Sequence, residues 1–152
     1  MKITQADLND IEEILNLQKL AFQSQAKIYN DQYLPPLIQK LDEIKEEFLE
    51  KIVLKALSDG KIIGSVRAHE DKGTCHIGRL IVHPDFQNQG IGKQLMKAIE
   101  DFFKECRRFE LFTGYKSEKN LHLYKKLNYK IYKTIEEDAC NRVKLFYMEK
   151  KR

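Results

Sequence analysis

The chain has 152 residues, of which 42% are hydrophobic and 33% are charged, and its formal net charge is +4 at pH 7. A chain of this length can bury a core without disulfides or metals, and the composition excludes an intrinsically disordered protein. The basic excess favours an anionic ligand. It is too small to indicate nucleic-acid binding by itself, so nucleic acid is not an expected partner.

The three cysteines, Cys75, Cys106 and Cys140, are widely spaced and form no C-x-x-C pair. They indicate neither a zinc site nor a disulfide framework, and a reduced, cytoplasmic setting is the simplest interpretation. The first residues lack the apolar run of a signal peptide, and no stretch approaches the ~18 apolar residues of a membrane-spanning helix. We therefore expect a cytoplasmic chain with no membrane partner, folded as a single domain over residues 1–152.

The first fifty residues predict one short strand and two helices. Residues 2–5 form the strand, and Asp7 or Asn9 caps the first helix. That helix carries an apolar stripe at helical spacing, formed by Leu8, Ile11, Ile14, Leu15 and Leu17. Pro35-Pro36 breaks the chain and opens the second helix. The apolar residues of this helix are Leu37, Leu41, Ile44 and Phe48. Residues 22–34 are polar and aromatic by turns and are assigned no regular element.

An antiparallel meander follows the helices. Its three strands are predicted at residues 52–57, 61–69 and 74–82. Asp59-Gly60 is a strong two-residue hairpin turn, and Asp71-Lys72-Gly73 marks a second hairpin. His83-Pro84 ends the third strand, because proline cannot continue the ladder of hydrogen bonds.

The remainder predicts a strand-helix-strand crossover and two closing strands. A helix begins near Gly90, and its apolar residues are Ile91, Leu95, Ile99 and Phe102. The later elements are a strand at 109–113, a helix at 117–127 with Ser117 as its N-cap, and strands at 129–135 and 142–149. Ligands tend to bind where the strand pattern of such a sheet switches, which is near residue 82 here.

The segment from Gln87 to Lys93 joins the third meander strand to a helix N-terminus. The first turn of a helix has unpaired N–H groups and a partial positive charge. Gly90 and Gly92 let a ligand approach the backbone without Cβ atoms in the way. The segment therefore suits a phosphate or pyrophosphate, although a G-x-G alone is weak evidence. The glycine spacing is neither that of a P-loop nor that of a dinucleotide fingerprint.

Two motifs together resemble the GNAT N-acetyltransferase superfamily. The first is the acetyl-CoA-binding pattern V-x-P-x-x-(Q/R)-x-x-G-(I/L)-G, which Val82, Pro84, Gln87, Gly90 and Gly92 match. The second is a helix end, L-Y-x-x-x-G-(F/Y), which the run from Leu123 to Tyr129 matches except at Asn128. Asparagine is the next most tolerant residue at a left-handed helix cap, so this departure costs little.

The resemblance implies the fold and the cosubstrate. The fold is the α+β GNAT fold, a mixed, mostly antiparallel sheet of six to seven strands flanked by about four helices and splayed between the fourth and fifth strands. Acetyl-CoA is the expected cosubstrate, with no metal. Backbone groups of Leu80, Ile81 and Val82 would pair with its pantetheine arm, and Gln87 would open and orient the pyrophosphate loop. The pyrophosphate would take amides from Asn88, Gln89, Gly90, Ile91, Gly92 and Lys93. Further contacts are expected from Ser117 and Asn120.

The resemblance also implies direct attack of a primary amine on the thioester in a ternary complex. Tyr124 is the expected general acid, because a phenol can protonate the leaving CoA thiolate. The alternative role of Tyr124 is packing in the core with Leu121 and Leu127. The general base has three candidates, which are His76 on the third meander strand, Glu110 on the next strand, and a chain of water molecules.

The acceptor that the resemblance implies is a small-molecule or peptide amine. The resemblance places the acceptor wall on the N-terminal helices and the loop between them, which hold Phe22, Tyr29, Asn30, Asp31, Tyr33 and the acidic residues after Asp42. Aromatic and acidic groups suit a cationic amine, and they equally suit ordinary packing. A polyamine-like amine, an amino sugar and a peptide N-terminus all remain open.

Two rival functions belong to other classes. A non-catalytic acyl-CoA-binding sensor or interaction module would show the same cofactor motif, although it would need no acid at Tyr124. A nucleic-acid-binding protein, or an acyltransferase acting on charged RNA, would show a basic stripe, whereas the Lys and Arg residues here are scattered. Homodimers are common among similar proteins, and the sequence carries no separate sign of one.

Overall fold

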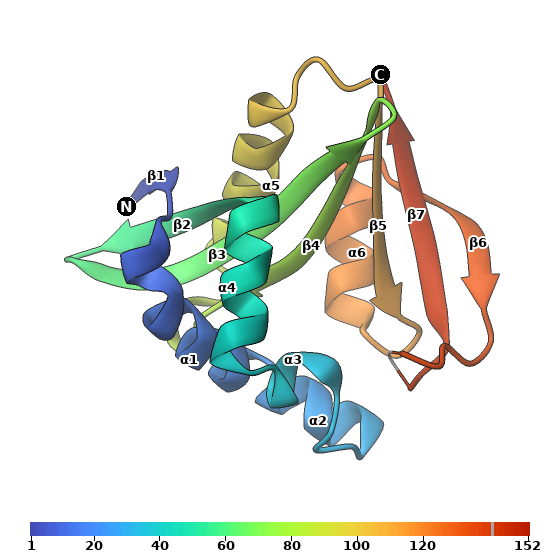
Figure 1. Cartoon of the computed structure of the whole chain (residues 1–152). Helices are drawn as coiled ribbons and strands as arrows, with labels where there is room; N and C mark the ends of the chain where they lie inside the picture. The colour runs from blue at the N-terminus through green and yellow to red at the C-terminus, as the bar shows by residue number, and fades with distance from the viewer. Residues whose placement is uncertain (141) are drawn as a thin grey trace.

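The computed structural model describes residues 1–140 and 142–152 (Figure 1), and these residues build one mixed sheet of seven strands. Its order is β1-β2-β3-β4-β5-β7-β6, and β4–β5 is the parallel pair within an otherwise antiparallel arrangement. The strands are β1 (Lys2–Gln5), β2 (Ile52–Ser58), β3 (Lys61–Asp71), β4 (Thr74–Val82), β5 (Arg108–Gly114), β6 (Lys130–Ile135) and β7 (Leu145–Lys151). The expected mixed, mostly antiparallel sheet of six to seven strands is confirmed.

Helices cover both faces of this sheet (Figure 1). They are α1 (Ile11–Ala21), α2 (Gln23–Tyr29), α3 (Pro35–Ile38), α4 (Leu41–Glu50), α5 (Ile91–Phe102) and α6 (Glu118–Lys126), with 3-10 turns at Leu8–Asp10 and Pro84–Phe86. One apolar cluster lies under α1 and α4, with Ile14 and Ile44 at its centre. A larger cluster lies under α5 and reaches α6, with Leu95 and Phe109 fully buried.

The splay between β4 and β5 is the feature that opens the sheet. The two strands pair over three positions, from Thr74↔Arg108 to His76↔Glu110. Beyond them β4 continues to Val82 and β5 to Gly114, and the strands diverge downward in Figure 1. The β5-facing backbone of the second half of β4 therefore has no strand partner among the described residues.

The N-terminal region differs from the prediction in two ways. As a result, the described residues form six helices, two of them short, where about four were expected. Residues 22–34 contain α2, where no helix was expected. Its helical periodicity consists of Phe22, Ala26 and Tyr29, at spacings of four and three residues. The helix expected from Pro35 onward is broken at Gln39, whose ψ of 136° is extended. A new helix starts after Lys40, because the backbone N–H of Lys40 donates to the Glu43 carboxylate (2.8 Å).

Candidate active site

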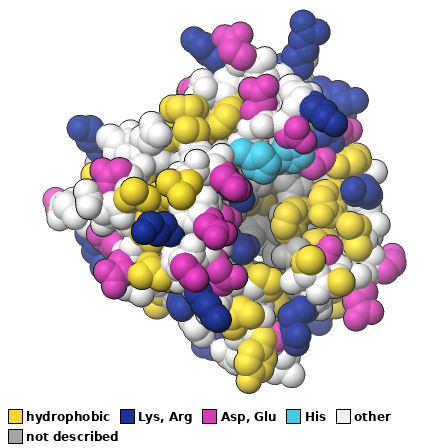
Figure 2. Space-filling model, viewed as in Figure 1, with side chains coloured by type: hydrophobic (Ala, Val, Ile, Leu, Met, Phe, Trp, Pro, Cys, Tyr) yellow, Lys and Arg dark blue, Asp and Glu magenta, His cyan; other side chains and the backbone are white. Residues whose placement is uncertain are grey.

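A cavity of about 320 Å³ occupies the splay between β4 and β5. Its wall comes from the α2–α3 region, from α4 and β3, and from the middle of β4. The end of β5, α6 and the start of β7 complete it. Figure 2 shows the hollow with histidine side chains at its rim and basic side chains within it. Of the predicted site residues, Tyr124, His76, Leu80, Ser117 and Asn120 line this cavity.

The loop from Gln87 to Lys93 lies outside the cavity wall. Among the described residues, no backbone carbonyl accepts a hydrogen bond from the amides of residues 88–93. Gly90 is the N-cap of α5 in the left-handed region, with φ of 80°. The first bond of the helix runs from the Gln94 N–H to the Gly90 carbonyl (3.0 Å), so the N–H groups of the first turn lack helical acceptors. The side-chain amide of Gln87 donates to the Val82 carbonyl (3.4 Å) and ties the loop to β4.

The two family motifs meet at Gly92. A Cβ atom on Gly92 would lie 3.4 Å from Leu123 Cδ2 and 3.8 Å from Leu80 Cδ2. The first turn of α5 therefore faces both β4 and α6, the helix that carries Tyr124. The two motifs are therefore packed against each other in the fold. Asn128, at the end of α6, has the left-handed φ of 74° that its position predicts.

Tyr124 is buried in the wall of the cavity and 6% exposed. Its ring packs edge-on against Tyr129, at 6.2 Å between ring centres. Burial is the one cause that raises the pKa of Tyr124, and no hydrogen bond reaches its hydroxyl from the residues described. The phenol is therefore protonated at neutral pH and has a free O–H to offer. A thiolate released beside it would be desolvated too, which raises the thiol pKa in the same direction.

His76 and Glu110, two of the three base candidates, lie together. His76 Nδ1 is 3.1 Å from Glu110 Oε2, because the parallel register places the two residues opposite each other. Burial would raise the pKa of Glu110, but hydrogen bonds from Tyr132 and Arg108 hold it below its ordinary value. The ring of His69 stacks on His76 at 5.1 Å, and burial lowers the pKa of His69. The cavity thus has an imidazole backed by an ionised carboxylate.

Ser117 holds α2 against the start of α6. Its hydroxyl donates to Gln25 Oε1 (2.7 Å) and shares a hydrogen bond with the Tyr29 hydroxyl (2.8 Å). The Tyr29 hydroxyl also accepts the Lys116 N–H (2.9 Å). Ser117 occupies the N-cap position but makes no side-chain capping bond, because its hydroxyl points to α2 instead. The cofactor contacts of Ser117 and Asn120 stay predictions.

The expected acceptor wall is present in part. Phe22 and Tyr29 line the cavity, whereas Asn30, Asp31 and Tyr33 do not. Asp31 instead pairs with Arg142 (2.8 Å), and Tyr33 is 65% exposed. Acidic side chains gather on the surface over α4 in Figure 2.

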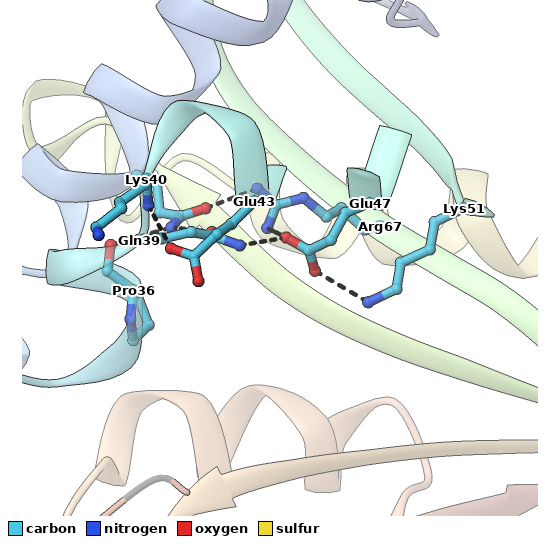
Figure 3. A network of polar contacts seen from close by, with 8 residues as sticks. Pro36, Gln39, Lys40, Glu43, Glu47, Lys51 and Arg67 are labelled. Atoms are coloured by element: carbon cyan, nitrogen blue, oxygen red, sulfur yellow. Dashed lines mark hydrogen bonds and ion pairs between the residues drawn. The ribbon is translucent and has the colours of Figure 1, made fainter. Parts of the chain in front are cut away.

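Glu47 is the carboxylate of α4 that reaches the cavity, and it belongs to a buried polar network (Figure 3). Lys51 Nζ donates to Glu47 Oε1 (3.0 Å), and the Gln39 amide donates to Glu47 Oε2. Arg67 Nη2 donates to Gln18 Oε1 (2.7 Å), and Arg67 Nη1 is 3.8 Å from Glu47 Oε2. The network joins α1, α3, α4 and β3 beneath the cavity.

Three basic side chains in the cavity wall were not predicted from the sequence. Lys51, Arg67 and Arg79 line the cavity, and Arg67 is 2% exposed. Burial lowers the pKa of Arg67 to about 10, with Glu47 opposing the shift and Arg79 adding to it. Arg79 has a left-handed φ of 48° at an irregular point of the β3–β4 pairing. Neither arginine stands in a recognisable motif, so only the assembled fold reveals them.

Gly114 is the tightest point of the contact between α2 and β5. A Cβ atom there would overlap the Tyr29 hydroxyl. We expect Gly114→Ala to displace Tyr29, break its bonds to Ser117 and Lys116, and lower the free energy of unfolding by about 1–3 kcal/mol. Chemical denaturation measures this loss. The same change at Gly78, where no atom lies within 4 Å of an added Cβ, is the control. If Tyr29→Ala does not reduce the cost of Gly114→Ala in the double variant, the overlap is not its cause.

Comparison with known proteins identifies the family. A model of the Acetyltransferase (GNAT) family matches residues 11–129. The chain belongs to that family, as its two motifs predict.

Individual relatives are distant. The chain is 24% identical over 140 residues to the UPF0157 protein YqkA of Bacillus subtilis (strain 168), covering 92% of this chain but 40% of YqkA. It is 25% identical to the spermidine N(1)-acetyltransferase of Thermoplasma acidophilum, covering 99% of this chain and 97% of that enzyme. Among solved structures, the PaiA N-acetyltransferase of Thermoplasma acidophilum in complex with coenzyme A has a TM-score of 0.74 at 18% identity, with both chains fully covered.

Residues 1–140 and 142–152, which the structure describes, show neither a metal cluster nor a membrane-spanning helix. These residues contain no group of three or more His, Cys, Asp or Glu side chains that could hold a metal ion. Among the same residues, no helix has both the length and the apolar character needed to cross a bilayer.

Proposed function

We propose that the chain is an acetyl-CoA-dependent N-acetyltransferase that moves the acetyl group to a primary amine by direct attack in a ternary complex. The observation that carries the proposal is the meeting of two motifs at the splay. Gly92, in the first turn of α5, packs beside Leu123 of α6, and Tyr124 of α6 lines the cavity between β4 and β5. A structural neighbour solved with coenzyme A and a relative that acetylates spermidine support this function.

The cofactor would enter from the α5 end of the splay. Free amides from Asn88 to Lys93 would bind the pyrophosphate, since helix N-termini bind phosphate without a metal. Unpaired backbone groups of β4 at Leu80, Ile81 and Val82 would bind the pantetheine arm. The seven strands form one sheet that extends past the matched residues 11–129, which supports a single domain over residues 1–152.

The reacting groups would meet inside the cavity. The amine nitrogen attacks the thioester carbonyl carbon, a C–N bond forms, and the C–S bond breaks. The Tyr124 hydroxyl gives its proton to the departing sulfur, and His76 takes the proton that the amine loses. Glu110 would act through His76, because its carboxylate orients the imidazole and stabilises its charged form.

The test is release of CoA thiol from acetyl-CoA in the presence of a panel of amines. We expect at least one amine to release thiol at a rate that saturates with both substrates, with the N-acetylated amine found by mass spectrometry. Binding of acetyl-CoA without transfer to any amine would refute the enzyme and favour the non-catalytic acyl-CoA-binding module. Failure to bind acetyl-CoA would refute both.

A further inference from the structure

The cavity has an excess of positive charge at its α4 side. Three cationic side chains of the described lining, Lys51, Arg67 and Arg79, face one carboxylate, that of Glu47. Glu47 is already engaged by Lys51 and by the Gln39 amide, and it stands 3.8 Å from Arg67. The carboxylate therefore cannot balance both guanidinium groups.

Part of this buried charge lacks hydrogen-bond acceptors. Arg67 Nε and Nη1 and Arg79 Nε are buried without a hydrogen-bond partner among the described residues. Arg67 is 2% exposed, and its charge and that of Arg79 repel each other. Burying an uncompensated charge costs several kcal/mol, so an unbalanced pair of arginines in a ligand-sized cavity indicates a missing anion.

The phosphates of CoA are not the expected source of that anion. The pyrophosphate loop, residues 87–93, does not line the cavity. Arg67 instead contacts Gln18 of α1 and Glu47 of α4. The acceptor is the remaining substrate of the proposed reaction, and it must enter this cavity to reach Tyr124.

We propose that the acceptor amine carries an anionic oxygen group, a carboxylate or a phosphate, which Arg67 and Arg79 bind. This inference rests on the proposed N-acetyltransferase function and narrows its substrate class. Guanidinium groups bind both anions in a two-pronged geometry, and the charge excess disfavours a polycation such as spermidine. The anion holds the acceptor so that its amine projects toward the splay.

The experiment compares amines that differ by the anion alone. Lysine is paired with cadaverine, ornithine with putrescine, and phosphoethanolamine with ethanolamine. We expect kcat/KM to be roughly 10- to 100-fold higher for the anionic member of the preferred pair, which is the usual contribution of a hydrogen bond to a charged group. The carboxylate and phosphate pairs identify which anion is used. Equal or faster turnover of the cationic members, or of spermidine, overturns the inference.

Arginine variants locate the anion. We expect Arg79→Gln and Arg67→Met to raise KM for the anionic amine at least about tenfold and to leave KM for its partner without the anion, and for acetyl-CoA, unchanged. Arg107→Gln, an exposed arginine outside the cavity, is the matched control. A rise in KM for acetyl-CoA alone would assign the arginines to the cofactor. An equal rise for both members of a pair would assign them to structure.

A binding measurement separates this inference from the proposed function. Calorimetric titration of the same amine pairs into the protein saturated with CoA measures the affinity of each amine without turnover. If no amine releases thiol, the enzyme proposal fails. Tighter binding of the anionic members, lost in Arg79→Gln, would still support the anion site, and equal binding would refute it.

Discussion

Replacing Tyr124 with phenylalanine is expected to lower kcat for acetyl transfer roughly 100- to 1000-fold, while KM for acetyl-CoA changes little. The phenol is buried in the wall of the cavity, and none of the described residues competes for its proton. Phenylalanine keeps the ring that packs against Tyr129, so it removes the proton donor and little else. Steady-state kinetics of thiol release measure both constants.

Tyr129 provides the matched control. It is as buried as Tyr124, but its hydroxyl donates to Glu100 Oε2 (2.8 Å) on the side of α5, away from the cavity lining. Tyr129→Phe should lower stability with little effect on kcat, since it leaves the Glu100 carboxylate without that donor. If Tyr124→Phe lowers stability and leaves kcat intact, Tyr124 is a core tyrosine and another group protonates the thiolate.

Local signals explain why the strands and the cofactor loop were predictable. Alternating and continuous apolar runs, punctuated by Asp59-Gly60 and His83-Pro84, mark β2 to β4 within a few residues of their observed ends. The sequence of α2 also has helical periodicity, because Phe22, Ala26 and Tyr29 are spaced by four and three residues. The helix has only seven residues, however, and so short a pattern does not distinguish a helix from a loop.

The acceptor side of the cavity depends on contacts that no local pattern encodes. Arg67 lies in a strand where an arginine would ordinarily face solvent, and it is buried because α1 and α4 bring Gln18 and Glu47 over it. The pairing of His76 with Glu110 likewise depends on the register of a parallel strand pair 34 positions apart in sequence. A contact between residues so far apart in sequence depends on the whole fold. The sequence therefore indicated His76 and Glu110 as alternative bases, whereas in the structure they form a pair.

Glu47 should contribute substantially to the stability of the fold, because its carboxylate faces both Lys51 and the buried Arg67. Glu47→Gln preserves the side-chain shape but removes the carboxylate that faces Lys51 and Arg67, and we expect the free energy of unfolding to fall by about 2–4 kcal/mol at pH 7. Glu46→Gln, on the exposed side of the same helix, should change it by less than about 0.5 kcal/mol. Urea denaturation of the three proteins gives the comparison.

The pH dependence of this loss identifies its cause. Burial would raise the pKa of Glu47, but the charge of Arg67 and the hydrogen bonds from Lys51 and Gln39 hold it below its ordinary value of 4.5. A carboxyl whose pKa is lowered in the folded state stabilises the fold above its unfolded pKa, and that stabilisation disappears as the pH falls through the folded pKa. The stability gap between the wild-type protein and Glu47→Gln should therefore be widest at neutral pH, narrow as the pH falls below 4.5, and disappear below the lowered pKa of Glu47 in the folded protein. A gap that stays constant into acid would mean that the amide disturbs packing, and that the charge of Glu47 does not hold the arginine side of the cavity in place.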